Sequence, residues 1–477
     1  MSQSAGARQQ RASLATMSIF SLTGLPLGAL GIAMAIYVQP YFAQDLGVGL
    51  VAIAAAFGVV RLLDTFVDPF LAVVMDRTRT PIGRYRAWLI AGTPIMMIAV
   101  YALFMARPGI GTSYLILWLL VLNLGTSIIG IARFAWSANL VTRYDQRSMF
   151  YGMMAAISVI GTLIVLLTPV VSKSFGPGLP NDVQLMGWTI LFLMPIGVAV
   201  NAWLVPEKIA TDVPHTRPPL HDYIDLMKRP ELIRLLVQSF ATTLGPGWMA
   251  NLYIFFFTAA RGFTTGQGSI LLIFYVLAGA LGAPLIGLTA ARFSKHRTLI
   301  AATICYSIGL CTVLAVPKAD LLLSIPVMIW CGYWGNGFDL MNSAMMADVG
   351  DQVRLEHGKE RMGLLYSIIT VSTKVANAGA VMIAYPLLAA IGFVPSLGAH
   401  NSASALAGLQ ISFLAGPIFF VALGGACCIG WKLDATRHAQ IRSELEARDA
   451  LLAQAAAGGS PLADHAIVAQ SPVAQST

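Results

Sequence analysis

The sequence predicts an all-α membrane protein with twelve transmembrane helices in two pseudo-symmetric bundles of six. The chain of 477 residues is 57% hydrophobic and only 11% charged, whereas a soluble domain carries roughly 25% charged residues. Apolar runs of about 20 residues, each long enough to cross the hydrocarbon core of a bilayer, recur from end to end. A polar, proline-rich stretch near the middle separates the first six runs from the last six.

The apolar runs are continuous and do not alternate with polar residues, which favours helices over the strands of a barrel. Twelve spans are therefore predicted, at residues 17–43, 50–75, 87–106, 113–139, 148–171, 187–205, 231–260, 267–291, 298–316, 321–347, 363–391 and 409–432. The segments between and around them are predicted as a cytoplasmic N-terminal tail (1–16), an N-terminal bundle (17–205), a central cytoplasmic loop (206–230), a C-terminal bundle (231–432) and a cytoplasmic helix with a disordered tail (433–477).

The basic residues predict the orientation of the spans. Most of the 30 Lys and Arg residues fall in the tails and the even-numbered loops, and only four fall in odd-numbered loops: Arg107, Lys173, Arg261 and Lys318. Because basic residues concentrate on the cytoplasmic side, we expect a multi-pass protein of the cell inner membrane with both termini cytoplasmic. Topology thus explains the formal net charge of +8, and nucleic acid is not an expected partner.

A weak internal repeat links the two predicted bundles. Pro69 near the end of the second span and Pro284 near the end of the eighth are each followed eight positions later by an arginine, Arg77 and Arg292. Two parallel halves with a substrate between them at mid-depth is the architecture of major facilitator carriers.

Three ionisable residues of the second span share one helix face. Arg61, Asp64 and Asp68 follow the spacing i, i+3, i+7. Each charge at mid-membrane costs about 2.5–3.5 kcal/mol on insertion scales, so these side chains must face each other, water or an ion. Two neighbouring carboxylates stay ionised only beside a cation, which predicts a site for Na⁺ or H⁺. The structural alternative is an Arg–Asp pair that holds this helix to a neighbour.

Other polar residues inside the spans add candidates. Lys374 in the eleventh span needs an anionic partner, and the aspartates of the second span are the best candidates; the alternative is a lysine that reaches the membrane interface. Arg133 could bind an anionic group of a substrate, and Asp339 is its rough counterpart in the second half. Trp136 could stack on a sugar ring. Each of these three residues could equally have a structural role.

These residues stand in motifs that resemble the glycoside–pentoside–hexuronide:cation symporters. The motifs are RLLDTFVDP and DRTRTPIGRYRAW in the first half, and MMADVGD, LLYSIITVSTK and IGFVPS in the second. The resemblance covers residues 15–435 and implies a cation site at Asp64 and Asp68, with Thr370 beside it. It also implies that Arg61 and Lys374 belong to the charge network and that Trp136 belongs to the sugar pocket.

Two positions depart from the family pattern. The aspartate that holds sugar hydroxyls in the first span aligns with Gly28, and the one in the fourth span aligns with Ala132. Their absence disfavours melibiose-like substrates and weakens the case for Na⁺. Arg133, beside Ala132, would suit a substrate with a carboxylate, such as a hexuronide. Lysolipid carriers of the same superfamily keep the aspartates of the second span and the lysine of the eleventh span. An amphiphilic substrate is therefore an alternative.

The expected function is secondary active transport by alternating access: symport of a glycoside, sugar or hexuronide with Na⁺ or H⁺. The alternative is a carrier of lysolipids or other amphiphilic or anionic solutes. Asp76, Arg77 and Arg84 in the loop after the second span are expected to form a cytoplasmic gate. The sequence shows no catalytic constellation and no metal-binding spacing, so we expect a monomeric carrier that is not an enzyme, has no cofactor and holds no metal beyond Na⁺.

Overall fold

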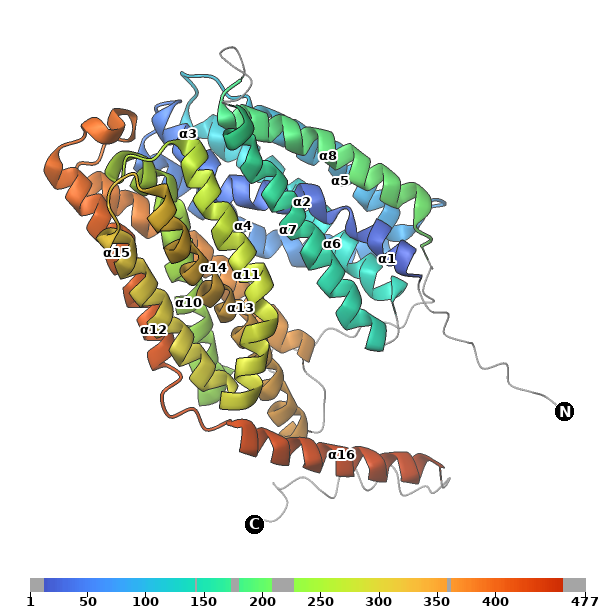
Figure 1. Cartoon of the computed structure of the whole chain (residues 1–477). Helices are drawn as coiled ribbons and strands as arrows, with labels where there is room; N and C mark the ends of the chain where they lie inside the picture. The colour runs from blue at the N-terminus through green and yellow to red at the C-terminus, as the bar shows by residue number, and fades with distance from the viewer. Residues whose placement is uncertain (1–12, 142–143, 173–179, 208–226, 358–361, 458–477) are drawn as a thin grey trace.

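The fold is described from a computed structural model of the chain, in which residues 13–141, 144–172, 180–207, 227–357 and 362–457 are described. Most of the predicted N-terminal tail and central loop, and the end of the C-terminal tail, lie outside these ranges. The described residues form helices that run roughly side by side in two groups, one on each side of the molecule (Figure 1).

The first group contains the helices before the central loop. They are α1 (Leu14–Ser21), α2 (Gly24–Ile32), η1 (Ala33–Tyr37), α3 (Val38–Gln44), α4 (Leu50–Arg77), α5 (Arg84–Phe104), α6 (Thr112–Leu140), α7 (Tyr144–Val171) and α8 (Asp182–Leu204). The second group follows the loop. It comprises α10 (Pro230–Phe255), η3 (Phe256–Ala260), α11 (Thr265–Phe293), α12 (Lys295–Ala315), α13 (Leu321–His357), α14 (Met362–Ala390), η4 (Pro395–His400), α15 (Ala403–Ala426) and α16 (Ala435–Ala457).

Eleven helical segments of the described residues are long and apolar enough to cross a membrane. The predicted seventh span, which corresponds to α10 and η3, is not among them, although it is a helix of full length. Its polar residues are buried against other helices: Gln238, Ser239, Thr242 and Asn251 have at most 6% of their surface exposed. Gln238 donates a hydrogen bond to Asn342 of α13 at 2.5 Å, so α10 is a twelfth spanning helix that packs through polar side chains.

The helix pairs of the two halves correspond. In the first half α2 packs on α7, α4 on α6, and α5 on α6 and α8; in the second half α10 packs on α14, α11 on α13, and α12 on α13 and α15. These are equivalent pairs when the six spans of each half are counted in order. The halves meet through α4 against α14 and through α7 against α11, which gives a major facilitator fold.

The first span is one predicted helix that the structure divides into α1, α2, η1 and α3. The π-helical turn η1 follows α2 directly and ends at Tyr37. Such turns widen the helix locally and are frequent at functional sites. Here the turn lies where the first half contacts α10 of the second half.

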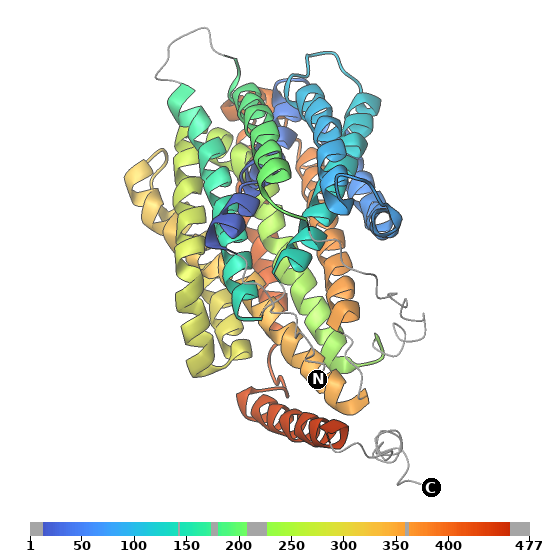
Figure 2. The ribbon, with the colours of Figure 1, turned by 90° about the vertical axis from the view of Figure 1, so that its right-hand side faces the viewer.

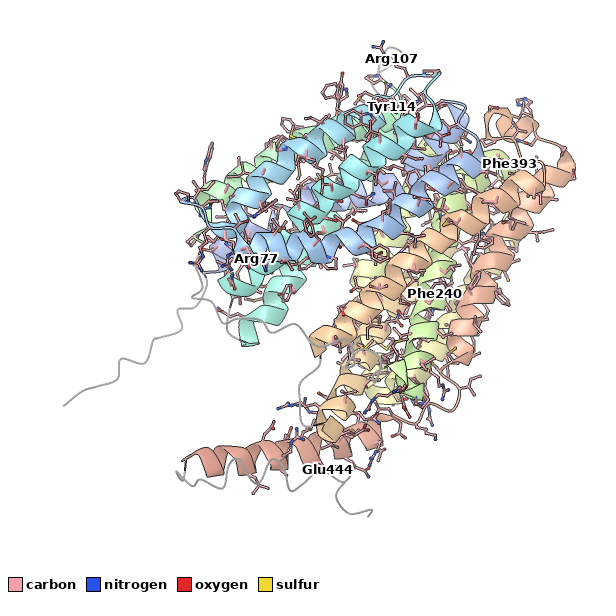
Figure 3. All side chains as sticks on the ribbon, turned by 180° about the vertical axis from the view of Figure 1, so that it is seen from behind. Arg77, Arg107, Tyr114, Phe240, Phe393 and Glu444 are labelled. Carbon is pink, nitrogen blue, oxygen red and sulfur yellow. The ribbon has the colours of Figure 1, made fainter. Side chains whose placement is uncertain are left out.

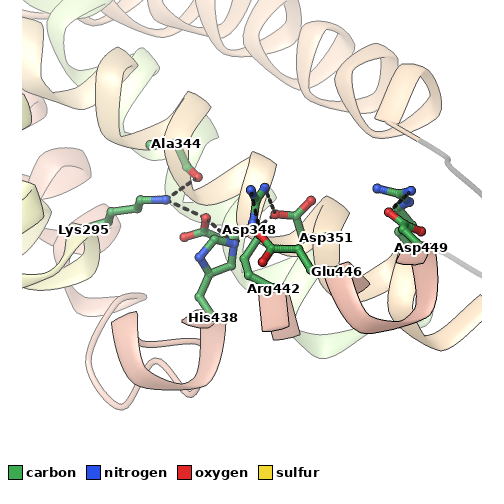
Figure 4. Close-up of polar contacts among 9 residues, drawn as sticks. Lys295, Ala344, Asp348, Asp351, His438, Arg442, Glu446 and Asp449 are labelled. Carbon is green, nitrogen blue, oxygen red and sulfur yellow. Dashed lines mark hydrogen bonds and ion pairs between the residues drawn. The ribbon is translucent and has the colours of Figure 1, made fainter. Parts of the chain in front are cut away.

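Helix α13 extends ten residues past the predicted end of its span at residue 347, and α16 is bound to this extension. His438 of α16 contacts Asp348 at 3.2 Å and Asp351 at 3.0 Å, while Lys295 of α12 donates to Asp348 at 2.5 Å (Figure 4). Ile441 and Leu445 of α16 are buried. The helix is longer than the predicted span because its last turns are polar and are held by ion pairs. Figure 2 shows α16, in red, lying across one end of the bundle.

The two halves are in contact at the end opposite α16, where Arg107, Tyr114 and Phe393 lie (Figure 3). Tyr37 and Ser269 share a hydrogen bond of 2.7 Å, and Gln39 donates to Asn251 at 2.9 Å. Among the hydrogen bonds between described residues, no other one joins the halves at that end, and none joins them at the α16 end. The halves diverge toward α16 (Figure 1).

Candidate functional site

Three of the predicted charges form one cluster between the halves. Lys374 of α14 donates to Asp64 at 2.7 Å and to Asp68 at 2.5 Å, both on α4. The i, i+4 spacing of the aspartates puts both carboxylates on one face of α4, and that face packs on α14. One ammonium group therefore bridges two carboxylates and connects the two halves at mid-depth.

The remaining oxygens of the two carboxylates differ. Ser127 of α6 donates to Oδ1 of Asp64 at 2.9 Å, whereas Oδ1 of Asp68 is buried and has no hydrogen-bond partner among the described residues. A buried acceptor without a donor is costly, and a cation or a proton would satisfy it. Sequence analysis missed Ser127, because a serine in an apolar span is too common to single out.

Arg61 lies one turn before Asp64 and faces a separate, smaller cavity of the first half. This cavity has a volume of about 270 Å³ and is lined by Arg61 together with Asn123 and Thr126 of α6. The guanidinium makes no hydrogen bond to another described residue. Arg61 thus belongs to the same helix face as the cluster but does not replace Lys374 as the partner of Asp64 or Asp68.

A large cavity lies beside the cluster, between the two halves. Its volume is about 1280 Å³, and α2, η1 and α7 line one side while α10, α11, α13 and α14 line the other. Thr373 and Asn377 of α14, which flank Lys374, are part of the lining. Asp339 of α13 also lines the cavity and is exposed to it. The charge cluster and the cavity therefore share one helix, α14.

Arg133 and Trp136 lie outside both cavities. They are one helical turn apart on the face of α6 that packs into the first half. Arg133 is only 6% exposed, and its Nε and Nη2 have no hydrogen-bond partner among the described residues. Trp136 is fully buried against Phe20, with ring centroids 5.5 Å apart. In this conformation neither residue lines either cavity, and their substrate contacts stay predictions.

Gly28 lies where α2 crosses α7. A Cβ atom at this position would stand 2.0 Å from the backbone oxygen of Ser158 of α7. Thr162 donates to the carbonyl of Gly28 at 3.1 Å across the same contact. The structure gives Gly28 a packing role, because this position lets α2 and α7 approach closely; its substrate role stays a prediction.

The substitution Gly28→Ala tests this packing role. Because the obstacle is backbone, the helices must separate, and overpacking of this kind costs about 1–3 kcal/mol. We expect a lower midpoint of thermal unfolding and weaker uptake. The matched control is Gly31→Ala, three residues away, where a Cβ meets nothing within 4 Å. Equal unfolding midpoints for the two variants would contradict the packing role.

Thr370, predicted to lie beside the cation site, makes no hydrogen bond with Asp64 or Asp68 among the described residues. It is exposed, and its hydroxyl donates to the Tyr366 carbonyl at 2.8 Å. The spacing of four residues puts Thr370 one turn from Lys374, but that spacing alone does not bring it to α4. Its role in the cation site stays a prediction.

The predicted gate loop between α4 and α5 is held within the first half. The side chain of Asp76 lies outside the described part of the structure, and Arg77 is exposed. The backbone N–H groups of Arg84 and Tyr85 donate to Glu207 at 2.8 and 2.7 Å, so a carboxylate caps the N-terminus of α5. Sequence analysis missed Glu207; its place directly after a span is the signal that could have found it. The gate stays a prediction.

The comparisons with known proteins decide the family. The family model described as MFS/sugar transport protein matches residues 19–435. The chain belongs to this family. As a member of the MFS/sugar transport proteins it belongs to a family of transporters. The resemblance to glycoside–pentoside–hexuronide symporters is confirmed.

Relatives of this MFS/sugar transport protein are sugar carriers. The isoprimeverose transporter of Lactiplantibacillus pentosus is 22% identical over 413 residues, which cover 83% of this chain and 84% of the relative. The glucuronide carrier protein homolog of Escherichia coli (strain K12) is 22% identical over 363 residues, covering 72% and 76%. Among solved structures, a mutant of the nucleoside transporter NupG superimposes with a TM-score of 0.67 at 12% identity, covering 87% of this chain and all of that one, which confirms the major facilitator fold.

Proposed function

We propose that this protein is a secondary active transporter that couples the entry of a cation, Na⁺ or H⁺, to the uptake of a glycoside or related sugar. It works as a monomer in the cell inner membrane, with both termini in the cytoplasm. The observation that carries the proposal is the contact of Lys374 with Asp64 and Asp68 beside the large cavity. A cluster of this kind can exchange one positive charge for another.

The coupling follows from competition between two cations for the same carboxylates. In the conformation described, the ammonium of Lys374 contacts both carboxylates and balances one of their two negative charges. A coupling cation that binds Asp64 and Asp68 would release Lys374 and remove the ion pair that joins α4 to α14. The halves contact each other at the Tyr37–Ser269 end and diverge at the other end. Loss of the Lys374 ion pairs would therefore let the halves rock about the cavity, as alternating access requires.

The nature of the solute has three candidates: a neutral glycoside or sugar, a hexuronide, and a lysolipid or another amphiphile or organic anion. The hexuronide hypothesis depended on Arg133 as the partner of a carboxylate. Arg133 lies outside the cavity in this conformation, which weakens that hypothesis relative to a neutral solute.

Uptake by purified protein in proteoliposomes tests the proposal. Labelled glycosides should accumulate above equilibrium when an inward gradient of either Na⁺ or H⁺ is imposed, by up to roughly tenfold for a tenfold gradient at 1:1 coupling. An ionophore that collapses the gradient should remove the accumulation; a liposome without protein is the control. Equilibration that ignores every cation gradient would show a uniporter and overturn the proposal.

A further inference from the structure

The large cavity has two chemically different walls. The wall from α2, η1 and α7 is apolar, with Ile32, Ile36, Val159 and Leu163 among its residues. The opposite wall, from α10, α11, α13 and α14, carries the polar side chains: Thr242, Tyr275, Asn336, Asp339 and Asn377 among them. A solute that fills this space must therefore present an apolar side to the first half and hydrogen-bonding groups to the second.

Asp339 gives the polar wall its charge. It is the only charged side chain among the described residues that line this cavity. Its carboxylate makes no hydrogen bond or ion pair with another described residue, although it faces the cavity. Within the described part of the chain, this carboxylate is thus available to a bound solute.

The three basic residues inside the predicted spans, Lys374, Arg61 and Arg133, do not pair with Asp339 in the described part of the structure. Lys374 is held by Asp64 and Asp68. Arg61 faces the smaller cavity, and Arg133 is buried beside Gly24 and Ser158. The large cavity is therefore negative on one side and apolar on the other. Charges interact strongly across a cavity with low-dielectric walls, so this arrangement favours hydrogen-bond donors and cations over anions.

From this juxtaposition we propose that the solute is an amphiphilic glycoside, neutral or amine-bearing, with an apolar aglycone. The aglycone lies against α7, and hydroxyl or ammonium groups of the sugar donate to Asp339. A carboxylate on the sugar would face Asp339 with like charge and is excluded. Asp339 is thus the residue that determines specificity. This inference rests on the proposed transport function and names its class of solute.

The test measures equilibrium binding to the protein in nanodiscs, so that it does not depend on coupling. Four probes share the gluco configuration of the pyranose ring: an aryl glucoside, the aryl 2-amino-2-deoxyglucoside, the aryl glucuronide and free glucose. The wild-type protein should bind the first two at least about tenfold more tightly than the glucuronide, because like charges repel across the site. It should also bind them about tenfold more tightly than glucose, which lacks the apolar ring.

Two variants assign these preferences to residues. Asp339→Asn should abolish the advantage of the amine and reduce the glucoside-to-glucuronide ratio by roughly tenfold. Val159→Asn should lower the aryl preference and leave the charge preference unchanged. The matched control is Asp320→Asn: Asp320 accepts a hydrogen bond from the Leu323 backbone at the start of α13, away from the cavity, and asparagine can take that place.

The outcomes separate this inference from the proposed function. Tighter binding of the glucuronide, no binding of any probe, or unchanged ratios in Asp339→Asn would overturn the inference even if cation-driven uptake is observed. Binding ratios as expected, together with uptake that ignores every cation gradient, would overturn the symport proposal and leave the assignment of the solute in place.

Discussion

Replacing Asp64 by asparagine should abolish cation-driven accumulation while the protein still inserts and folds. The variant keeps the shape of the side chain and its contact with Ser127, but it removes one of the two charges that hold Lys374. A charge-assisted hydrogen bond contributes about 1.5–3 kcal/mol, which corresponds to roughly 10- to 150-fold in cation affinity. Labelled substrate should then reach only the equilibrium level in proteoliposomes.

The control for Asp64→Asn is Asp45→Asn, the same change at an acidic residue outside the cluster. Asp45 follows α3 and accepts a long hydrogen bond from Asn181 at 3.4 Å. Burial raises the pKa of the Asp45 carboxyl, with a further contribution from the nearby Asp182, against the opposing effect of Asn181. We expect this control to accumulate substrate normally. Accumulation against the gradient by Asp64→Asn would refute the role of the cluster in coupling.

A disulfide between α7 and α11 should stop transport reversibly. A Cβ atom on Gly266 would lie 3.7 Å from the Cα of Val170, so the two positions are close enough for a disulfide, whose Cβ atoms lie about 3.5–4.5 Å apart. These residues belong to different halves, at the end where Tyr37 contacts Ser269. If this end must open in each cycle, the oxidised Val170→Cys/Gly266→Cys variant should lose essentially all uptake, and dithiothreitol should restore it.

The single variants are the controls for this cross-link. Gly266→Cys places a Cβ 2.9 Å from the carbonyl oxygen of Pro169, so it can lower activity by itself, and the recovery on reduction separates that effect from the cross-link. The five native cysteines are all free, and the single variants also report any effect of the oxidant on them. Full uptake by the oxidised double variant, with the disulfide verified by mass spectrometry, would show that this end stays closed during transport.

The features that could be predicted from the sequence are those that a lipid environment requires. Apolar run length located the spans, and the cost of burying a charge singled out Asp64, Asp68 and Lys374, which the structure brings together. The sequence could not reveal which side chains meet across helices with ordinary composition, such as Ser127 with Asp64. It also could not separate Trp136 in a binding pocket from Trp136 packed on Phe20, because both require only an aromatic residue in a helix.

Other differences have a physical cause that a single sequence hides. Hydropathy reflects lipid contact, so the predicted span ends at residue 347 although helix α13 continues to His357. Helix α10 has a lower hydropathy than the other spans because its polar residues face protein. Gly28 aligned with a binding residue of the family, yet the close approach of the Ser158 backbone makes it a packing position. Matching a residue to a position of the family does not show whether the fold leaves room for a side chain there.

Helix α13 has 37 residues and is therefore about 55 Å long, whereas a bilayer core needs roughly 30 Å. Its surplus turns project beyond the lipid and bear α16, whose described contacts join it to α13. A fluorophore on an exposed residue of α16 would consequently track the second half as a rigid body. Paired with a dye on the exposed Arg77 position of the first half, it would turn the rocking of the carrier into a distance signal that needs no substrate label.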